Sequence, residues 1–181
     1  MDSDKLKKEM SNVFAMQSRI VGRLGTQLNY EAIERLVDKM VSCSKAGGTV
    51  LLMGMGISSA VCKSASYMLR GGGICCIHIE IDSDAAAKAG FIRKDDLVVV
   101  VSRKGINQDV YQMAKIAKER GAYIFTITNY PASRLAVWSD DMLLVPLGRE
   151  EMEGEYLPVA SGIAMSSLFN AIGSALKEKN K

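Results

Sequence analysis

Two short segments of the sequence combine glycines with side chains that can hold an anion. The first segment, GMGISS, has Gly54 and Gly56, which let backbone N–H groups approach a ligand closely. Ser58 and Ser59 add hydroxyl groups, and the helix expected after them brings the positive end of its dipole to the same place. The segment therefore predicts a phosphate site, with an ordinary tight turn as the alternative.

The second segment, SRKGIN, joins a run of four valines to another expected helix. Ser102 and Gly105 suit a tight loop, and Asn107 can cap the helix with its side chain. Lys104 brings a full positive charge, and charged donors bind phosphate more strongly than neutral ones. Its neighbour Arg103 either reaches the same phosphate or, as we expect, is a solvent-exposed loop cation. The segment predicts a second phosphate-binding loop.

The elements that must position these loops follow from the apolar pattern. Apolar runs predict five strands, at 49–54, 74–81, 96–102, 122–128 and 142–147. Helical periodicity alternates with them, at 58–69, 84–89, 107–120 and 131–138. Nearly continuous apolar strands separated by helices are typical of a parallel sheet covered on both faces. In such sheets, ligands bind outside the carboxyl ends of the strands, where both loops lie.

The predicted fold class is therefore α/β, a five-stranded parallel sheet sandwiched by helices in the three-layer manner of flavodoxin-like and Rossmann-like folds. No linker or repeat divides the chain, so residues 1–181 are expected to form one domain. Helices occupy 1–45, the parallel α/β core spans 49–147, and an amphipathic helix at 158–178 closes the chain.

Composition excludes several classes of function. The net charge of +3 is small and its lysines and arginines are scattered, which argues against nucleic-acid binding. No apolar run approaches the roughly 18 residues of a membrane span, and the charged start lacks a signal core, so we expect a cytoplasmic protein without membrane contact. The four cysteines form no CxxC pair and there is one histidine, so no metal or other cofactor is expected.

Several segments, in the right order, resemble the SIS (sugar isomerase) domain family of phosphosugar isomerases and phosphosugar-binding proteins. The first loop is similar to the family's G-x-G-x-S, on Gly54, Gly56 and Ser58. The family's strand-and-loop pattern D-x-V-I-x-x-S-x-S-G-x-T is similar to DLVVVVSRKGIN. Two later patterns resemble AKIAKERGAYIFTIT and SRLAVWSDDMLLVP. The resemblance covers residues 30–176 and implies a SIS-type fold that binds a sugar phosphate.

Within the family, the chain most resembles arabinose-5-phosphate isomerases without their regulatory CBS domains. GREEMEGEYLPVAS at 148–161 is similar to their R-E-A-C-P-x-x-x-x-P-T-S-S segment, which places Arg149 and Glu150 on its Arg and Glu.

At three positions this sequence has a residue of different charge or polarity from those isomerases. Ile57 stands where they carry Lys, Lys104 replaces the second Ser of the second loop, and Ile106 replaces its Glu. Their H-G-D-L-G segment corresponds to AAKAG, which keeps only Gly90. These departures preserve phosphate binding better than they preserve catalysis.

An aldose–ketose isomerase needs a base that removes a proton beside a carbonyl and a donor that stabilises the enediolate. The resemblance implies Glu150 as that base. The neighbouring acids are substitutes, and a solvated charge run is the structural alternative for all of them: Glu151, Glu153 and Glu155. His78 is a second acid–base candidate, although its place between Ile77 and Ile79 on a strand suits a structural histidine as well.

Three functions remain open at this point. The chain is expected to be an isomerase that acts on a pentose or hexose phosphate through an enediol(ate), with a non-catalytic sugar-phosphate-binding module as the alternative. A dinucleotide-binding protein is a distant third, because Ser59 replaces the last glycine of G-x-G-x-x-G. The resemblance also implies a homodimer or homotetramer, in which a neighbouring subunit could supply a base. The amphipathic helices at 5–24 and 158–178 would pack on that neighbour or on their own sheet.

Overall fold

The computed structural model describes residues 2–153 and 157–179. In chain order its elements are α1 (Ser3–Gln27), α2 (Tyr30–Lys45), β1 (Val50–Gly54), α3 (Ile57–Gly71), β2 (Cys76–Glu80), α4 (Ala85–Ala89), β3 (Leu97–Val101), α5 (Gln108–Glu119), β4 (Tyr123–Thr128), α6 (Arg134–Trp138), β5 (Asp141–Leu144), α7 (Arg149–Glu153) and α8 (Leu157–Lys179).

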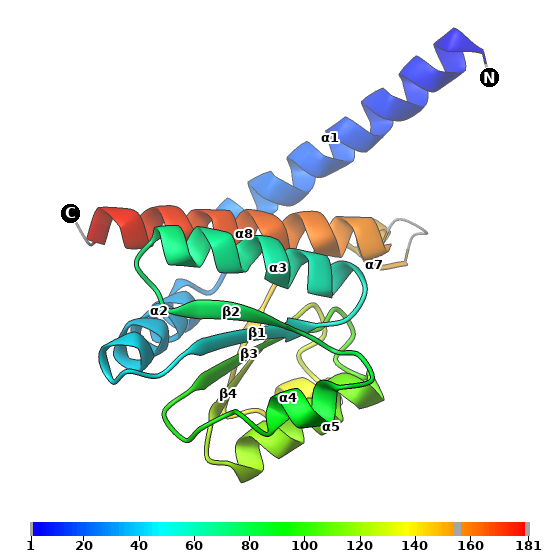
Figure 1. Cartoon of the computed structure of the whole chain (residues 1–181). Coiled ribbons are helices and arrows are strands. Elements are labelled where there is room, and N and C mark those ends of the chain that lie inside the picture. The colour runs from blue at the N-terminus through cyan, green and yellow to red at the C-terminus, as the bar shows by residue number, and fades with distance from the viewer. Residues whose placement is uncertain (1, 154–156, 180–181) are drawn as a thin grey trace.

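The five strands form one sheet in the order β2-β1-β3-β4-β5, and all four pairings are parallel. This confirms the predicted α/β class and the five predicted strands. The order reverses at β1, since β2 pairs with one side of β1 and β3 with the other. The loops after β1 and β3 therefore leave the same edge of the sheet side by side, as Figure 1 shows.

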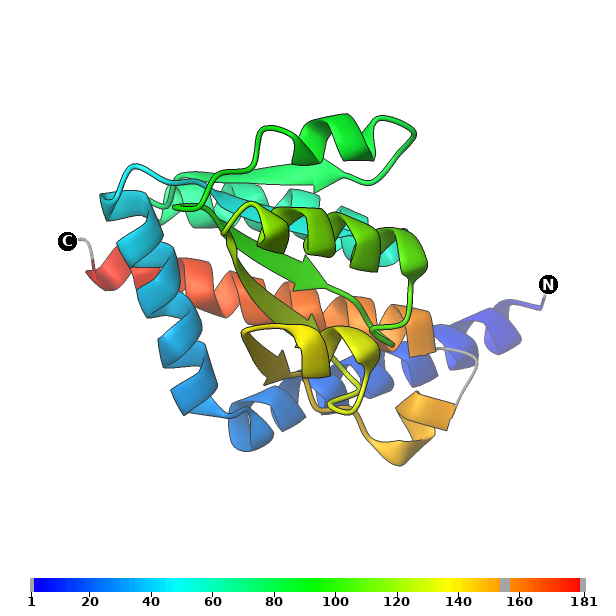
Figure 2. The same cartoon turned by 90° about the horizontal axis from the view of Figure 1, so that it is seen from below.

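Helices cover both faces of the sheet because alternate strand residues point in opposite directions. Val50 and Leu52 pack into a core with residues of α1, α2, α3 and α8. Leu51 and Met53 pack into a second core with residues of α4, α5 and α6. Figure 1 shows α3 and α8 on one side of the strands and α4 and α5 on the other, and Figure 2 shows the same arrangement from the side of α4 and α5. Because helices cover both faces of the sheet, every residue of β1 and β3 is buried.

Most expected helices are present, with small shifts at their ends. The helix expected at 131–138 begins at Arg134, because the Ser133 hydroxyl accepts a hydrogen bond from Ala136 N and caps it. The apolar pattern does not predict the short helix α7, since its acidic residues suit a solvated loop. It matters for the site because it carries three of the four acids considered as bases.

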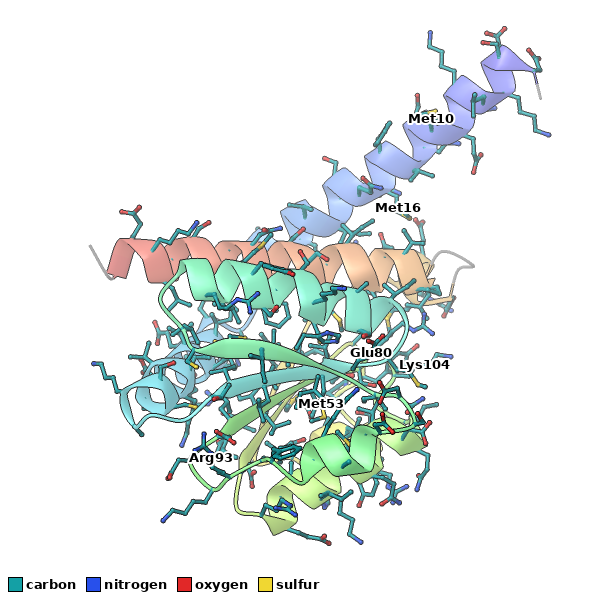
Figure 3. The ribbon with its side chains drawn as sticks, in the orientation of Figure 1. Met10, Met16, Met53, Glu80, Arg93 and Lys104 are labelled. Atoms are coloured by element: carbon teal, nitrogen blue, oxygen red, sulfur yellow. The ribbon has the colours of Figure 1, made fainter. Side chains whose placement is uncertain are left out.

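The two long helices differ in how much of their apolar surface is covered. The N-terminal half of α1 extends away from the body, and Met10 on it is exposed, whereas Met16 is buried (Figures 1 and 3). By length and composition, α8 is the one described helix able to cross a membrane, over Leu157–Glu178. Half of that stretch is buried in the protein, and α8 packs on α1 and α3, which is the environment of a core helix.

Candidate functional site

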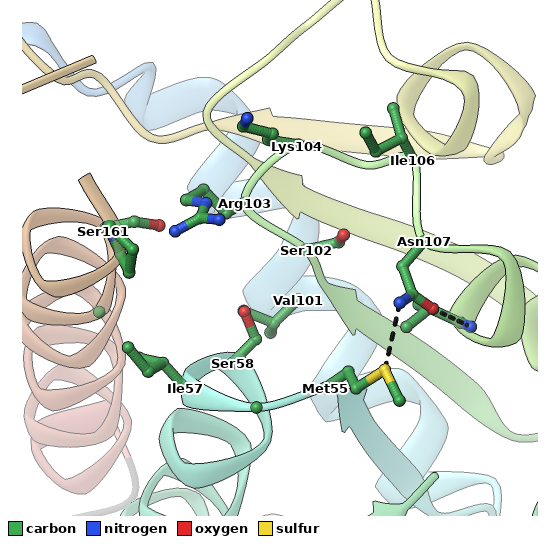
Figure 4. A pocket seen from close by; sticks show the side chains of 14 residues that line it. Met55, Ile57, Ser58, Val101, Ser102, Arg103, Lys104, Ile106, Asn107 and Ser161 are labelled. Atoms are coloured by element: carbon green, nitrogen blue, oxygen red, sulfur yellow. Dashed lines mark hydrogen bonds between the residues drawn. The ribbon is translucent and has the colours of Figure 1, made fainter. Parts of the chain in front are cut away.

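A pocket of about 620 Å³ lies at the carboxyl ends of β1 and β3, against the first turns of α8. Figure 4 shows it between the two glycine-containing loops and α8. Its lining consists of Met55, Gly56, Ile57, Ser58, Val101, Ser102, Arg103, Lys104, Ile106, Asn107, Val110, Pro158, Ser161 and Gly162. The pocket brings together Gly56, Ser58, Ser102, Lys104 and Asn107 of the residues predicted to bind phosphate.

The first loop turns tightly from β1 into α3. Gly56 precedes α3 with a φ of +60°, a conformation that disfavours residues with a Cβ atom. A Cβ atom on Gly54 would lie 2.9 Å from the Val101 carbonyl oxygen, so glycine lets the loops after β1 and β3 approach each other. Ser58 faces the pocket, whereas Ser59 lies on the other side of the loop.

The second loop is held by hydrogen bonds among its own residues. Gly105 has a φ of +60° and its N–H donates to Ser102 Oγ over 3.2 Å. Asn107 caps α5, because its Oδ1 accepts from Val110 N over 3.0 Å. The Asn107 amide nitrogen points at Met55 Sδ across the pocket, 3.1 Å away (Figure 4). Gly105 therefore shapes the loop, and the side chains around it line the pocket.

Arg103 differs from its expected place as an exposed loop cation, because it is half-buried and lines the pocket. Its carbonyl oxygen accepts hydrogen bonds from Asn129 N (3.1 Å) and Thr128 Oγ1 (3.0 Å) at the end of β4. These bonds fix the backbone from which the side chain extends. Among the described residues, Arg103 Nε is the one buried side-chain nitrogen or oxygen without a hydrogen-bond partner.

The sequence alone did not predict that residues of α8 line one side of the pocket. The Ser161 hydroxyl donates to Asn129 Oδ1 over 2.6 Å, and Asn129 Nδ2 donates to the Val145 carbonyl oxygen over 2.7 Å. These buried bonds tie α8 to the ends of β4 and β5. A signal for this wall was available, since Pro158 and Ser161 stand on the last Pro and Ser of the arabinose-5-phosphate isomerase segment compared above.

The acids of α7 lie away from the pocket lining. Glu150 is exposed, and Glu153 pairs on the surface with Arg149. Glu151 is 4% exposed and accepts a 2.9 Å hydrogen bond from Arg23 of α1. Glu155 lies outside the described residues. No Asp or Glu of residues 2–153 and 157–179 lines the pocket.

The buried pair of Glu151 and Arg23 fixes α7 against α1. Burial acts to raise the pKa of Glu151, but the hydrogen bond and charge of Arg23 outweigh it and hold the pKa below its ordinary value of 4.5. A Cβ atom on Gly148 would clash with Glu151 Oε2 and lie 2.6 Å from an Arg23 nitrogen. Glycine at this position therefore makes room for the pair.

We expect Glu151→Gln to lower the free energy of unfolding at pH 7 by about 1–2 kcal/mol, because a neutral amide binds Arg23 more weakly than a carboxylate. The folded-state pKa is depressed, so this stabilisation is present above 4.5 and is lost as the pH falls through the folded value. Urea unfolding of both proteins between pH 3 and pH 7 measures the difference. Glu153→Gln, in the exposed pair, serves as the control with no measurable effect. A difference that stayed constant down to pH 3 would contradict the assignment.

His78 lies on β2, outside the lining of the pocket. Its Nε2 and Ser59 Oγ are 2.9 Å apart, and burial lowers its pKa below the ordinary value of 6.5. His78, Ser59 and Gly54 line a separate, smaller pocket of about 330 Å³ together with Lys63 and Glu80. The catalytic roles predicted for His78 and Glu150 stay predictions.

The geometry suits a small ligand that carries a phosphate. Hydroxyl and amide donors, the N-terminus of α5 and two cations meet in one concave pocket whose described lining has no carboxylate. A dianion gains both hydrogen bonds and charge there. The apolar side chains of Ile57 and Ile106 complete the pocket wall next to these donors (Figure 4).

Comparisons with known proteins agree with this geometry. The chain is 28% identical to the arabinose 5-phosphate isomerase KpsF of Escherichia coli over 162 residues, which cover 90% of this chain and 47% of the relative. It is 30% identical over 110 residues to the 3-hexulose-6-phosphate isomerase of Mycobacterium gastri, covering 61% of this chain and 53% of the relative. The chain thus spans about half the length of these curated relatives.

Among solved structures, a protein of Escherichia coli CFT073 in complex with arabinose 5-phosphate superposes with a TM-score of 0.88 at 19% identity, covering 99% of this chain and 94% of the other. The NanR protein of Vibrio vulnificus complexed with ManNAc-6P superposes with a TM-score of 0.79 at 22% identity, covering 98% and 66%. These likenesses confirm the fold. The SIS domain model matches residues 43–175, most of the chain including both loops and the pocket, so the protein belongs to the SIS domain family.

Proposed function

We propose that this protein binds a pentose or hexose phosphate in the pocket and interconverts its aldose and ketose forms through an enediol(ate). The observation that carries the proposal is the convergence of Ser58, Ser102, Lys104 and Asn107 on one pocket at the sheet edge. Its relatives KpsF and the 3-hexulose-6-phosphate isomerase are named as isomerases of such compounds. The dinucleotide-binding alternative has no support from the family to which the chain belongs.

The phosphate would be held by the two loops. Ser58 and Ser102 offer hydroxyl groups, and α5 directs the positive end of its dipole toward the same region. Lys104 adds a cation where the isomerases have a serine. The sugar would then extend toward Ile57 and α8, which form the rest of the lining.

Glu150 remains our candidate for the base. Among the described acids of α7, Glu151 is committed to Arg23 and Glu153 to Arg149, whereas Glu150 has no ion pair. It is exposed outside the pocket lining, so catalysis requires that it approach the sugar or that another subunit supply a base. His78 would act from the neighbouring pocket, where its low pKa favours the neutral form that accepts a proton.

A second candidate function is a binding module that senses or sequesters a sugar phosphate. It is favoured by one observation, the absence of a carboxylate from the described lining of the pocket. The relative NanR was solved as a complex with ManNAc-6P, which makes ligand binding a common property to test first.

Incubation of arabinose 5-phosphate with the protein in deuterated water distinguishes the two functions. An isomerase exchanges deuterium into the carbon beside the carbonyl, and we expect Glu150→Gln to slow this exchange by about a hundredfold or more. Glu153→Gln, one turn away on the surface, is the matched control and should leave the rate unchanged. Wild-type protein that binds the compound, as seen by thermal stabilisation, but exchanges nothing would favour the binding module.

We further propose a homodimer or homotetramer located in the cytoplasm. Leu6, Met10 and Phe14 are exposed on the part of α1 that projects from the body, and a second copy of the chain would cover them. A monomer mass by light scattering would contradict the oligomer.

A further inference from the structure

We infer that the Arg103 guanidinium binds the carbonyl end of the sugar phosphate, the end opposite its phosphate. There it would stabilise the negative charge that develops on the carbonyl oxygen. This inference rests on the proposed sugar-phosphate site and assigns a charge-binding residue to it. It begins from the buried Arg103 Nε, which has no hydrogen-bond partner among the described residues.

The guanidinium lies apart from two of the groups proposed for the phosphate, Ser102 and Asn107. Figure 4 shows Arg103 directed toward Ser161 on α8, whereas Ser102 and Asn107 lie on the other side of the pocket. The backbone of Arg103 is fixed by the hydrogen bonds that its carbonyl oxygen accepts from Thr128 and Asn129. The side chain therefore reaches across the pocket from a rigid base.

The described residues that line the pocket offer Arg103 no counter-charge. The pocket has no carboxylate in its described lining, and the relatives' lysine and glutamate positions are Ile57 and Ile106 here. The hydrogen of the Ser161 hydroxyl is used by Asn129, so that hydroxyl can offer only its oxygen. A half-buried guanidinium with no carboxylate in the described lining favours a ligand that carries negative charge to it, because Coulomb attraction is stronger where the protein partly displaces water.

The isomerisation develops charge at that end of the sugar. When a base breaks the C2–H bond of an aldose phosphate, the bond's electron pair forms the C1=C2 double bond and the carbonyl pair moves to O1. Arg103 donates an N–H to this oxyanion and stabilises the enediolate. Return of the proton to C1, with transfer of the O2 proton to O1, gives the ketose. The guanidinium keeps its proton throughout.

Two ligands of equal length isolate this role without requiring turnover. The aldonic acid 5-phosphate of arabinose has a carboxylate at C1, and arabinitol 5-phosphate has a neutral hydroxymethyl group there. By titration calorimetry, we expect the wild type to bind the acid at least about tenfold more tightly than the alditol. We expect Arg103→Gln to bring that ratio to within about threefold, because it changes the alditol affinity little.

Two further variants make the result specific. Arg103→Lys keeps the charge but not the forked donors, and should give a ratio between those of the wild type and Arg103→Gln. Arg93→Gln removes an exposed arginine at the opposite end of the sheet and should keep the wild-type ratio (Figure 3).

Each other outcome overturns a distinct part of the argument. Equal affinities of the wild type for the acid and the alditol would remove the proposed charge recognition while leaving the sugar-phosphate site intact. An equal loss of affinity for both ligands in Arg103→Gln would assign the guanidinium to the phosphate instead. Failure of the wild type to bind either compound would overturn the proposed site itself, and the role of Arg103 with it.

Discussion

Gly105→Ala is expected to destabilise the protein by about 3 kcal/mol and to abolish measurable binding of sugar phosphates, because it combines backbone strain with a steric clash. Gly105 has a φ of +60°, and a Cβ atom there would overlap Ser133 Oγ and lie 2.6 Å from Ser133 Cβ. The Gly105 N–H also donates to Ser102, and its carbonyl oxygen accepts from Leu135 N. A shift of Gly105 that relieves the clash therefore disturbs its hydrogen bond to the pocket residue Ser102.

Two controls separate the clash from the strain. Gly47 has a φ of +77°, and a Cβ atom there would meet nothing within 4 Å, so Gly47→Ala should cost only about 1 kcal/mol. Adding Ser133→Gly to Gly105→Ala removes the side chain nearest to the new Cβ atom. The double variant should recover part of the stability lost in Gly105→Ala, even though Ser133→Gly also removes the side-chain cap of α6. Urea unfolding measures all four proteins. Equal costs for Gly105→Ala and Gly47→Ala would show that the contact with Ser133 does not determine the loop.

The sequence predicted the sheet well because each strand is specified locally. Five-residue runs such as Leu97–Val101 are buried at every position, so their apolar character is visible without knowledge of any partner. The loops after β1 and β3 were also predictable, since parallel strands put their carboxyl ends on one edge. Ser58, Ser102, Lys104 and Asn107 consequently line one pocket, as expected.

Contacts between distant parts of the chain were not predictable in the same way. Glu151 reads as one member of an acidic run, and only its contact with Arg23, 128 residues away, distinguishes it from Glu150. Likewise, nothing near Arg103 in the sequence indicates that Thr128 and Asn129 fix its carbonyl group. Such roles depend on which elements become neighbours after the sheet has formed.

The pairing of His78 with Ser59 explains why spacing alone gave an ambiguous role for the histidine. Ser59 belongs to the first loop by sequence, but its side chain points away from the pocket and toward β2. Adjacent residues Ser58 and Ser59 therefore serve two different pockets. A helix turns by about 100° per residue, so neighbouring side chains in the first turn of α3 leave the helix in different directions, and that of Ser59 meets His78 on β2.

Lys104→Glu is expected to weaken the binding of arabinose 5-phosphate by at least about a hundredfold at low salt, because it removes a cation and places an anion beside the phosphate. Lys104 is exposed on the loop and lines the pocket, so the substitution is compatible with folding. Lys104→Ala, which removes the charge without reversing it, should weaken binding by only about tenfold. Titration calorimetry measures both affinities, and a thermal melt confirms that the variants are folded.

Position and ionic strength test whether this effect is local. Lys94→Glu makes the same change in net charge, but at the amino end of β3, opposite the pocket. Because salt screens distant charges, this variant should keep the affinity within about twofold of the wild type. The loss in Lys104→Glu should shrink as ionic strength rises from about 0.01 M to 0.15 M, since exposed charges are screened over about 30 Å and 8 Å respectively. Equal losses in Lys94→Glu and Lys104→Glu would mean that net charge, and not the loop, attracts the phosphate. Because Lys104 is assigned to the phosphate, which both ligands carry, Lys104→Glu should weaken the acid and the alditol phosphates by the same factor, which keeps the two cations experimentally distinct.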